Sequence, residues 1–256
     1  MVSDSRISGG ANILTDEGAK LFSLPVVCRR PDADGFFSVP YFIRDFGVGC
    51  VGSTLGYQNI YAFLVASLSN LVGDGKHVPS LGDIAAMAAR VATAYVRSVG
   101  QHNRLAHRLE LVVAGQCPAT GPSAYAVVPR LENDCIHFRA DEVALDGGRA
   151  HFIGDCTQKA DEALLAARAG ESEASIGWHR APARVVREFI EDPELPTIGG
   201  DAQIGLTVGA RFVRMGTVSP IVEGQPAAVM RLNNIDILAA GNVGPCAIGI
   251  DGMAGI

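Results

Sequence analysis

The sequence lacks the features of several large functional classes. Its 256 residues contain 21 Lys and Arg against 27 Asp and Glu, a net charge of −6, so no basic excess favours nucleic-acid binding. No apolar run reaches the roughly 18 residues of a membrane-spanning helix, because polar residues interrupt the best stretch, Ile60–Val72. Residues Met1–Arg6 show no basic segment followed by an apolar one. We therefore expect a cytoplasmic protein without a signal peptide.

Cysteine is sparse and scattered. The six cysteines lie at positions 28, 50, 117, 135, 156 and 246, and none forms a Cys-x-x-Cys pair. A zinc ribbon or a thioredoxin-like site needs such a pair, and a disulfide scaffold needs a denser set. The six histidines show no metal-binding spacing either. We expect reduced thiols, no metal site and no cofactor.

Hydrophobic periodicity predicts strands and helices that occur in blocks along the chain. Extended segments are predicted at 2–7, 20–27, 36–51, 109–115, 124–129, 136–140, 150–153, 203–208 and 211–217. Helices are predicted at 57–71, 84–99, 157–169 and 182–190. Elements that come in blocks disfavour a doubly wound parallel sheet. They favour an α+β fold, a four-layer αββα sandwich of two antiparallel sheets between helix pairs.

The predicted elements end near residue 217. Residues 1–217 are expected to form one domain. Residues 218–256 are rich in glycine, alanine and proline and show no clear period, so they are treated as an unassigned extension that stays loose or follows the surface.

One glycine motif resembles a dinucleotide-binding loop. Gly47–Gly52 matches Gly-x-Gly-x-x-Gly, precedes a predicted helix and is followed 22 residues later by Asp74. A dinucleotide site needs a parallel strand after one helix, whereas here a second helix comes first. The favoured interpretation is a strand-to-helix corner where glycine lets backbones approach closely. A dinucleotide-binding oxidoreductase is kept as a remote alternative.

A second set of short motifs occurs in a specific order. They are Ser3–Gly10, Lys20–Leu24, Gly47–Ser53, Leu111–Gly115, Phe152–Asp155 and Ile198–Gly200. In content and order they resemble a proteasome β-type subunit, and equally its bacterial relatives HslV and Anbu. These are N-terminal-nucleophile hydrolases. The 16-residue step from Asp4 to Lys20 matches the family's spacing and is the most specific single point.

The resemblance implies catalytic roles for three residues. Lys20 would lie beside the nucleophile and lower the pKa of its amine or hydroxyl through like charge. Asp4 would hydrogen-bond and orient that lysine. The backbone N–H of Gly52 would donate to the oxyanion of the tetrahedral intermediate.

The resemblance also implies a substrate site. Ser8 would lie on a strand edge that pairs with an extended peptide, a β-augmentation mode. Ile7 and Cys50 would line a small apolar pocket for the residue before the scissile bond. Weaker matches to the family's remaining site residues are Asp155, Asp192 and Thr197.

The nucleophile itself matches no residue of this sequence. The family uses an N-terminal Thr, Ser or Cys about 16 residues before the aspartate matched by Asp4, and this sequence begins three residues before it. Two readings stay open: a threonine-type peptidase whose nucleophile strand is not in this sequence, and a non-catalytic structural or binding homologue. The resemblance further implies a ring-like homo-oligomer, a polypeptide substrate and an ATP-dependent unfoldase as a partner.

Overall fold

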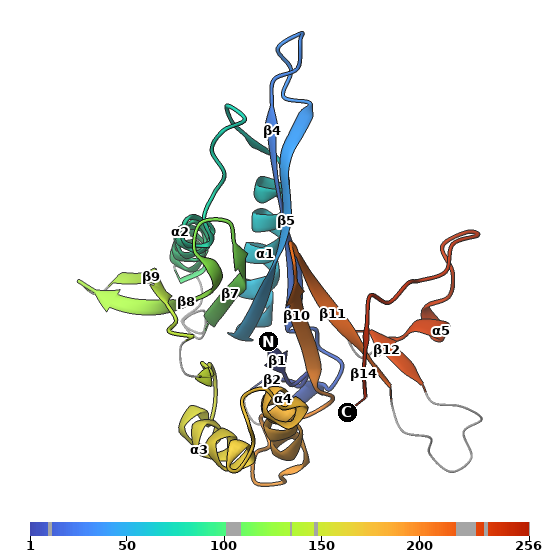
Figure 1. The fold of residues 1–256 in the computed structure, drawn as a ribbon. Coiled ribbons are helices and arrows are strands. Elements are labelled where there is room, and N and C mark those ends of the chain that lie inside the picture. Colours follow the sequence, from blue (N-terminus) through green and yellow to red (C-terminus); the bar gives the residue numbers. More distant parts are fainter. Residues whose placement is uncertain are drawn as a thin grey trace. The chain divides into compact units, whose positions relative to one another are not determined.

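The structure, a computed structural model, describes residues 1–9, 12–100, 109–133, 135–145, 148–218, 229–232 and 235–255. Figure 1 shows the helices and strands in chain order. The internal contacts divide the chain into two compact units. The first unit consists of Met1–Leu21, Gly154–Leu206 and Val213–Ile256. The second consists of Phe22–Ile153 and Thr207–Phe212.

The second unit is built on one large sheet, with the strand order β6-β4-β5-β7-β8-β9. These strands are β4 (Leu21–Arg30), β5 (Val39–Gly52), β6 (Leu71–Val72), β7 (Leu109–Cys117), β8 (Gly121–Glu132) and β9 (Cys135–Glu142). The pairs β5–β7, β7–β8 and β8–β9 are antiparallel, while the short β6 runs parallel to β4. Burial alternates strictly along β7, as expected for a strand with two different faces.

Two helices of the second unit pack on this sheet. They are α1 (Thr54–Leu68) and α2 (Leu81–Gly100). Ser53 caps α1 by accepting from the Gly56 N–H. Helix α2 begins with a capping box, in which Ser80 and Asp83 bond each other's backbone N–H groups. No described helix is both long and apolar enough to cross a membrane.

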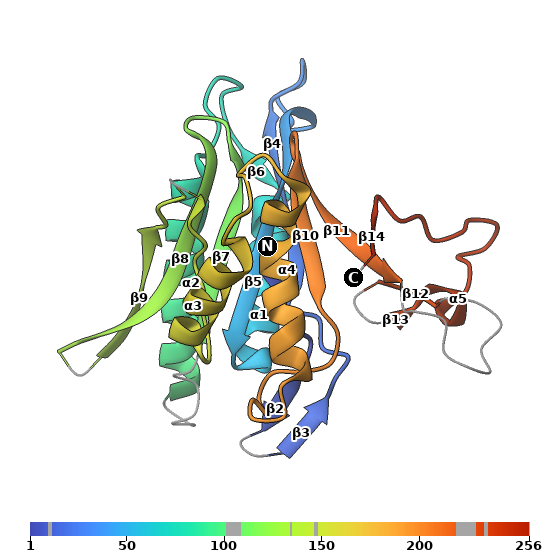
Figure 2. The ribbon, with the colours of Figure 1, turned by 60° about the horizontal axis from the view of Figure 1, so that its bottom comes forward.

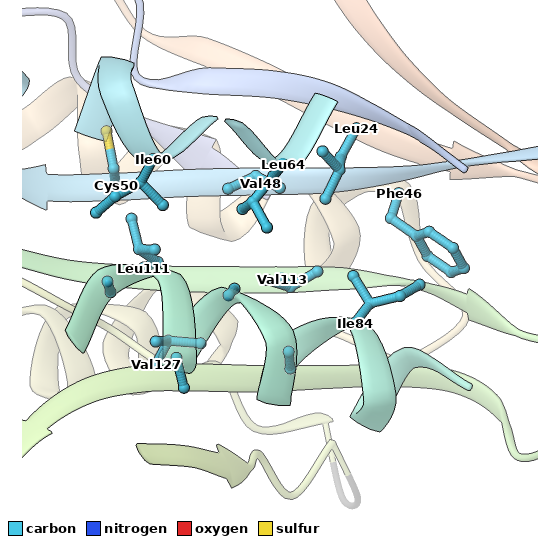
Figure 3. Close-up of a cluster of buried hydrophobic side chains, with 14 of the residues drawn as sticks. Leu24, Phe46, Val48, Cys50, Ile60, Leu64, Ile84, Leu111, Val113 and Val127 are labelled. Carbon is cyan, nitrogen blue, oxygen red and sulfur yellow. The ribbon is translucent and has the colours of Figure 1, made fainter. Parts of the chain in front are cut away.

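The core of the second unit lies between these helices and the sheet. Figure 3 shows its centre, where Val48 and Leu24 from the sheet meet Leu64 from α1, and Leu111 and Val113 lie by α2. Each of these side chains is at most 1% exposed. Side chains buried this completely are closely packed, so a substitution that removes core volume is expected to destabilise the unit.

The first unit contains a second sheet, with the strand order β1-β10-β11-β12-β13. Its strands are β1 (Val2–Ser3), β10 (Gln203–Val208), β11 (Arg211–Val218), β12 (Met230–Leu232) and β13 (Ile235–Asp236). A further strand, β14 (Met253–Gly255), pairs in parallel with the end of β11. A separate hairpin is formed by β2 (Ile7–Gly9) and β3 (Asn12–Thr15), seen with β14 in Figure 2.

The helices of the first unit are α3 (Thr157–Arg168), α4 (Ile176–Glu191) and the single turn α5 (Ile237–Ala240). The pair α3 and α4 packs together, and α4 also touches β1. Ser175 caps α4 by accepting from the Trp178 N–H. The Arg168 guanidinium lies over the Trp178 ring, 4.4 Å from its centroid, and links the two helices.

The mixed α+β class is confirmed, and several predicted segments need correction. Residues 2–7 form β1 and the start of β2, and the chain between them is in neither strand because Asp4 and Ser5 accept from the N–H groups of Gly199 and Asp201. The segment 150–153 contains no strand. Helix α4 begins six residues before the predicted 182, since its cap is Ser175 and Pro182 lies inside it. The extension after residue 217 is not a bare tail, because β12, β13, α5 and β14 lie within it.

The dinucleotide interpretation has no support in the fold. Gly47–Gly52 lies inside β5, in an antiparallel ladder with β7, and does not form a loop that could surround a pyrophosphate. A Cβ on Gly47 would lie 2.3 Å from the Phe212 ring. Gly47 therefore makes room for an aromatic ring and not for a neighbouring backbone, and the predicted strand-to-helix corner lies at Gly52, where φ is +91°.

Neighbouring leucines of α3 test the packing of the first unit. Leu164 is 4% exposed and Leu165 is 74% exposed. Leu164→Ala is expected to lower the free energy of unfolding by about 2–5 kcal/mol, because it empties buried volume. Leu165→Ala should change it by less than about 0.5 kcal/mol. Urea unfolding of both variants checks this, and equal losses would show that the described burial on α3 is wrong.

Candidate functional site

Asp4 and Lys20 form an ion pair in the first unit. Asp4 follows β1 and Lys20 directly precedes β4, so the pair joins two strand ends. The Lys20 Nζ lies 2.7 Å from the Asp4 Oδ1, and the two side chains are only 16% and 15% exposed. Charges this far removed from water are costly unless they are paired, so the geometry makes each group dependent on the other.

The second oxygen of the Asp4 carboxylate is held by backbone. Oδ2 accepts from the N–H groups of Arg6 and Gly199, both at 3.2 Å. These bonds fix the orientation of the carboxylate and hence of the Lys20 ammonium. An ammonium has three protons to donate, and within the described residues the Lys20 ammonium donates only to Asp4. The ammonium can therefore donate to a further group.

The backbone at Lys20 is anchored by Gln203 of β10. The N–H groups of Lys20 and Leu21 both donate to the Gln203 Oε1, at 2.9 and 3.2 Å, and the Gln203 Nε2 donates to the Gly18 carbonyl at 2.8 Å. Gln203 is 5% exposed, so its amide is buried with bonds on both its atoms. Sequence reasoning missed this residue. Its position in a predicted buried strand was the only signal.

Ser5 links three loops around the pair. Its N–H donates to the Gly199 carbonyl at 3.1 Å, and its hydroxyl donates to the Asp16 carbonyl at 2.5 Å and accepts from the Asp201 N–H at 2.8 Å. Gly200 has φ of +75°, and a Cβ there would lie 2.2 Å from the Ser5 Oγ. Only glycine fits this turn, which explains one residue of the Ile-Gly-Gly motif.

Arg6 ties the loop before β10 to the same site. Its Nε and Nη2 donate to the two carboxylate oxygens of Asp16, at 2.6 and 3.2 Å. Its Nη1 lies 3.1 Å from the Pro196 carbonyl and 3.3 Å from the Ile198 carbonyl. The bond from Arg6 lowers the pKa of Asp16 below its usual range. Arg6 was part of the quoted motif, but no role had been assigned to it.

The predicted substrate residues of the first unit lie on β2. Ser8 pairs with Ile13 of β3, so its strand is one arm of a hairpin. Ile7 is half-buried and packs on Gly18, where a Cβ would lie 2.3 Å from the Ile7 Cδ1. Their roles toward a substrate stay predictions.

Gly52 and Cys50 belong to the second unit. Gly52 ends β5 with φ of +91°, a conformation that favours glycine. Cys50 is 9% exposed and lies in the core of that unit beside Ile60 (Figure 3). The oxyanion role of the first and the pocket role of the second stay predictions.

The weaker candidates are spread over the first unit. Asp155 is exposed in the turn before α3, and Thr197 is exposed in the loop before β10. Asp192 ends α4 and accepts from the Lys159 Nζ at 2.8 Å, a bond that lowers the pKa of Asp192. Within the described residues, no hydrogen bond or ion pair joins any of the three to Asp4 or Lys20. No group of three or more His, Cys, Asp or Glu there is placed to hold a metal ion.

Comparison with solved structures gives the fold. The chain is similar to Anbu from Pseudomonas aeruginosa, described as a helical assembly, with 15% identity, a TM-score of 0.56, and 88% of this chain and 83% of that chain covered. It is similar to a mutant of Anbu from Hyphomicrobium sp. strain MC1, with 16% identity, a TM-score of 0.53 and coverage of 83% and 80%. It is also similar to Anbu, the ancestral β-subunit, from Yersinia bercovieri, with 14% identity, a TM-score of 0.50, and 79% of this chain and 74% of that chain covered.

The fold is that of Anbu chains. This confirms the resemblance to proteasome β-type subunits at the level of fold. No protein-family model and no curated protein sequence matches the chain. Sequence identities of 14–16% establish a shared fold and do not establish a shared activity.

Replacing Arg6 tests how the loop at Gly199 is held. Arg6→Lys removes the planar fork that bonds Asp16 and two carbonyls, so it should lower the free energy of unfolding by about 1.5–3 kcal/mol. The control is Arg187→Lys, because Arg187 makes an exposed pair with Glu191 one turn away in α4. That change should cost less than about 0.5 kcal/mol. Urea unfolding measures both, and an equal effect would mean that Arg6 is only a surface charge.

Acid should weaken the same contact. The folded pKa of Asp16 is lowered, so its pair with Arg6 stabilises the protein above the ordinary carboxyl pKa and is lost as the pH falls through the folded pKa. Between pH 7 and pH 3 the wild type should therefore lose more stability than Asp16→Asn. Urea midpoints at each pH give the comparison. Parallel curves for the two proteins would show that Asp16 contributes nothing to the acid sensitivity.

Proposed function

We propose that the chain is a proteasome-like peptidase subunit that hydrolyses amide bonds of polypeptides with an N-terminal nucleophile. The observation that carries this proposal is the sheltered Asp4–Lys20 pair at 2.7 Å, in which Lys20 retains donor capacity. Surface ion pairs are common and contribute little. The Asp4–Lys20 pair differs from a surface pair because both side chains are sheltered and both carboxylate oxygens are bonded, and it lies on a fold shared with Anbu chains.

In this proposal Lys20 supplies positive charge beside the nucleophile. That charge lowers the pKa of a neighbouring hydroxyl or thiol, which makes its oxygen or sulfur a better nucleophile at neutral pH. It also lowers the pKa of the α-amine, which is then unprotonated and can accept the proton. The nucleophile attacks the peptide carbonyl, its proton passes through the α-amine to the leaving amine, and the C–N bond breaks. Water then hydrolyses the ester or thioester. The Gly52 N–H is proposed to donate to the oxyanion.

The unpaired edge of β1 supports a position for the nucleophile beside Asp4. β1 pairs with β10 on one side, and no described strand pairs with its other side. An unpaired strand edge is a template for another strand. We propose that a strand carrying Thr, Ser or Cys at its start pairs there, next to Asp4, which directly follows β1.

The finer architecture follows from the same proposal. We infer the four-layer αββα sandwich, with an extended peptide held along Ser8 and a small apolar pocket that involves Ile7 and Cys50. We also infer self-association into a ring or helix, supported by the similar Pseudomonas aeruginosa chain described as a helical assembly. A cytoplasmic location and an unfoldase partner belong to the proposal as well.

A non-catalytic homologue is the second candidate. It is favoured by one observation, that the Asp4 carboxylate is bonded within the protein by the Lys20 ammonium and by the N–H groups of Arg6 and Gly199. In that reading the Asp4–Lys20 pair has a structural role, and the open edge of β1 binds a strand from a partner protein.

The decisive experiment uses protein made from the native gene with its own upstream DNA. N-terminal sequencing reports the first residue, and hydrolysis of fluorogenic peptides with a small apolar residue before the scissile bond reports activity. Lys20→Ala should lower kcat by about 100-fold or more, the range for activating and proton-transfer groups. Lys76→Ala is the matched control, since Lys76 is exposed in the loop before α2 and is none of the proposed site residues, and it should leave kcat unchanged.

The two candidates give opposite results. A first residue of Thr, Ser or Cys together with hydrolysis that depends on Lys20 supports the peptidase. Protein that begins at Met1 and cleaves no peptide would contradict it and would support the non-catalytic homologue.

A further inference from the structure

Helix α1 contains no charged residue. The uncharged stretch extends beyond the helix on both sides, from Phe46 to Gly73, between Asp45 and Asp74. A helix buried on all sides can lack charge, but a surface helix normally has a polar outer face. In the second unit α1 packs on one face of the sheet and turns its own outer face away from it. The absence of charge on that outer face needs an explanation.

The two faces of α1 differ in burial, and the exposed face combines apolar residues with two uncharged polar ones, Gln58 and Asn59. The inner face is buried in the core; its residues are Tyr57, Ile60, Leu64 and Leu68. The outer face carries Leu55 and Phe63, with 68% and 54% of their surfaces exposed, and the exposed alanines 62 and 66. We call these four residues the α1 patch. Clustered exposed apolar side chains on one helix face mark an interaction surface.

A second exposed apolar region lies at the end of the β4–β5 hairpin. Residues 35–43 contain no charge, and Phe36, Phe37 and Ile43 have exposures of 72%, 46% and 65%. We call these three residues the hairpin patch. Figures 1 and 2 show the hairpin extending beyond α1 within the second unit.

The turn of this hairpin is ordered by Asp32. Its Oδ1 accepts from the N–H groups of Asp34 and Phe36, at 3.0 and 2.9 Å, and its Oδ2 accepts from the Ser38 hydroxyl at 2.5 Å. Phe36 is thus presented on a fixed turn before any contact is made. A preorganised protrusion loses less conformational entropy on binding than a loose loop does.

We propose that the α1 patch of one copy binds the hairpin patch of a second copy, head to tail. Neither patch carries a charge, so the contact removes no ionic group from water. The two patches occupy different surfaces of one unit, and a contact between unlike patches repeats from copy to copy as a ring or a helical filament. This inference rests on the self-association in the proposed function and names its surface.

The contact area needed for a stable interface favours a contact between the two patches over one made by α1 alone. The 15 residues of α1 span about 22 Å, at about 1.5 Å per residue. One face of so short a helix is smaller than the roughly 800 Å² per partner of a stable interface. A protruding hairpin that inserts aromatic rings against the helix enlarges the contact, and aromatic side chains dominate interface energies.

The test compares the oligomeric state of four proteins by analytical ultracentrifugation. Wild type should sediment as an assembly larger than the 26.8 kDa chain. Phe63→Glu and Phe36→Glu should each weaken association at least tenfold. The control Leu165→Glu introduces the same charge at a residue of α3 that is 74% exposed, and it should assemble as the wild type does. Far-UV circular dichroism confirms folding, and Leu55→Glu replaces Phe63→Glu if that variant does not fold.

Mixing the two variants distinguishes the arrangements. Phe63→Glu retains an intact hairpin patch and Phe36→Glu an intact α1 patch, so an equimolar mixture should form a dimer that goes no further. Association that survives Phe63→Glu would overturn the proposed surface while leaving self-association intact. Association lost in Phe63→Glu but kept in Phe36→Glu would overturn the head-to-tail contact. Monomeric wild type would overturn both the surface and the proposed self-association, but not the peptidase site.

Discussion

The sheltered ammonium of Lys20 is the constraint on which the first unit depends. A charge with this little exposure requires a fixed counter-charge, and Asp4 supplies it at 2.7 Å. Asp4 in turn is held by the Gly199 N–H, and the loop of Gly199 is held by Ser5 and Arg6. Two strand ends and the loop before β10, almost 200 residues apart in sequence, therefore meet around one ion pair. Networks in which every member is bonded define one geometry more strictly than isolated contacts do.

Local patterns in the sequence were sufficient for much of the fold. The apolar spacing of α1 and α2 and the alternation of β7 act within a few residues, so these elements were predicted nearly to their ends. Caps determined the rest of the boundaries. The cap at Ser175 was missed because Pro182 was treated as the start of α4. Proline fits a first turn well, which made that choice reasonable.

Long-range contacts were beyond sequence reasoning. The approach of Asp4 to Lys20 was expected only from the family resemblance, since nothing local brings residues 16 apart together. Gln203 was missed because its task, bonding the backbone at Lys20 and Gly18, is visible only once β10 is placed. The strands after residue 217 were missed for the same reason, because β14 gains its order by pairing with β11.

The central claim is that the Asp4–Lys20 pair activates an N-terminal nucleophile. The most direct test treats protein from the native gene with an electrophilic peptide that traps such nucleophiles, then locates the adduct by intact mass and fragmentation. The account predicts one adduct per chain, on an N-terminal Thr, Ser or Cys, formed much more slowly in Asp4→Asn. Labelling that is absent, or equally fast in Asp4→Asn, would contradict it.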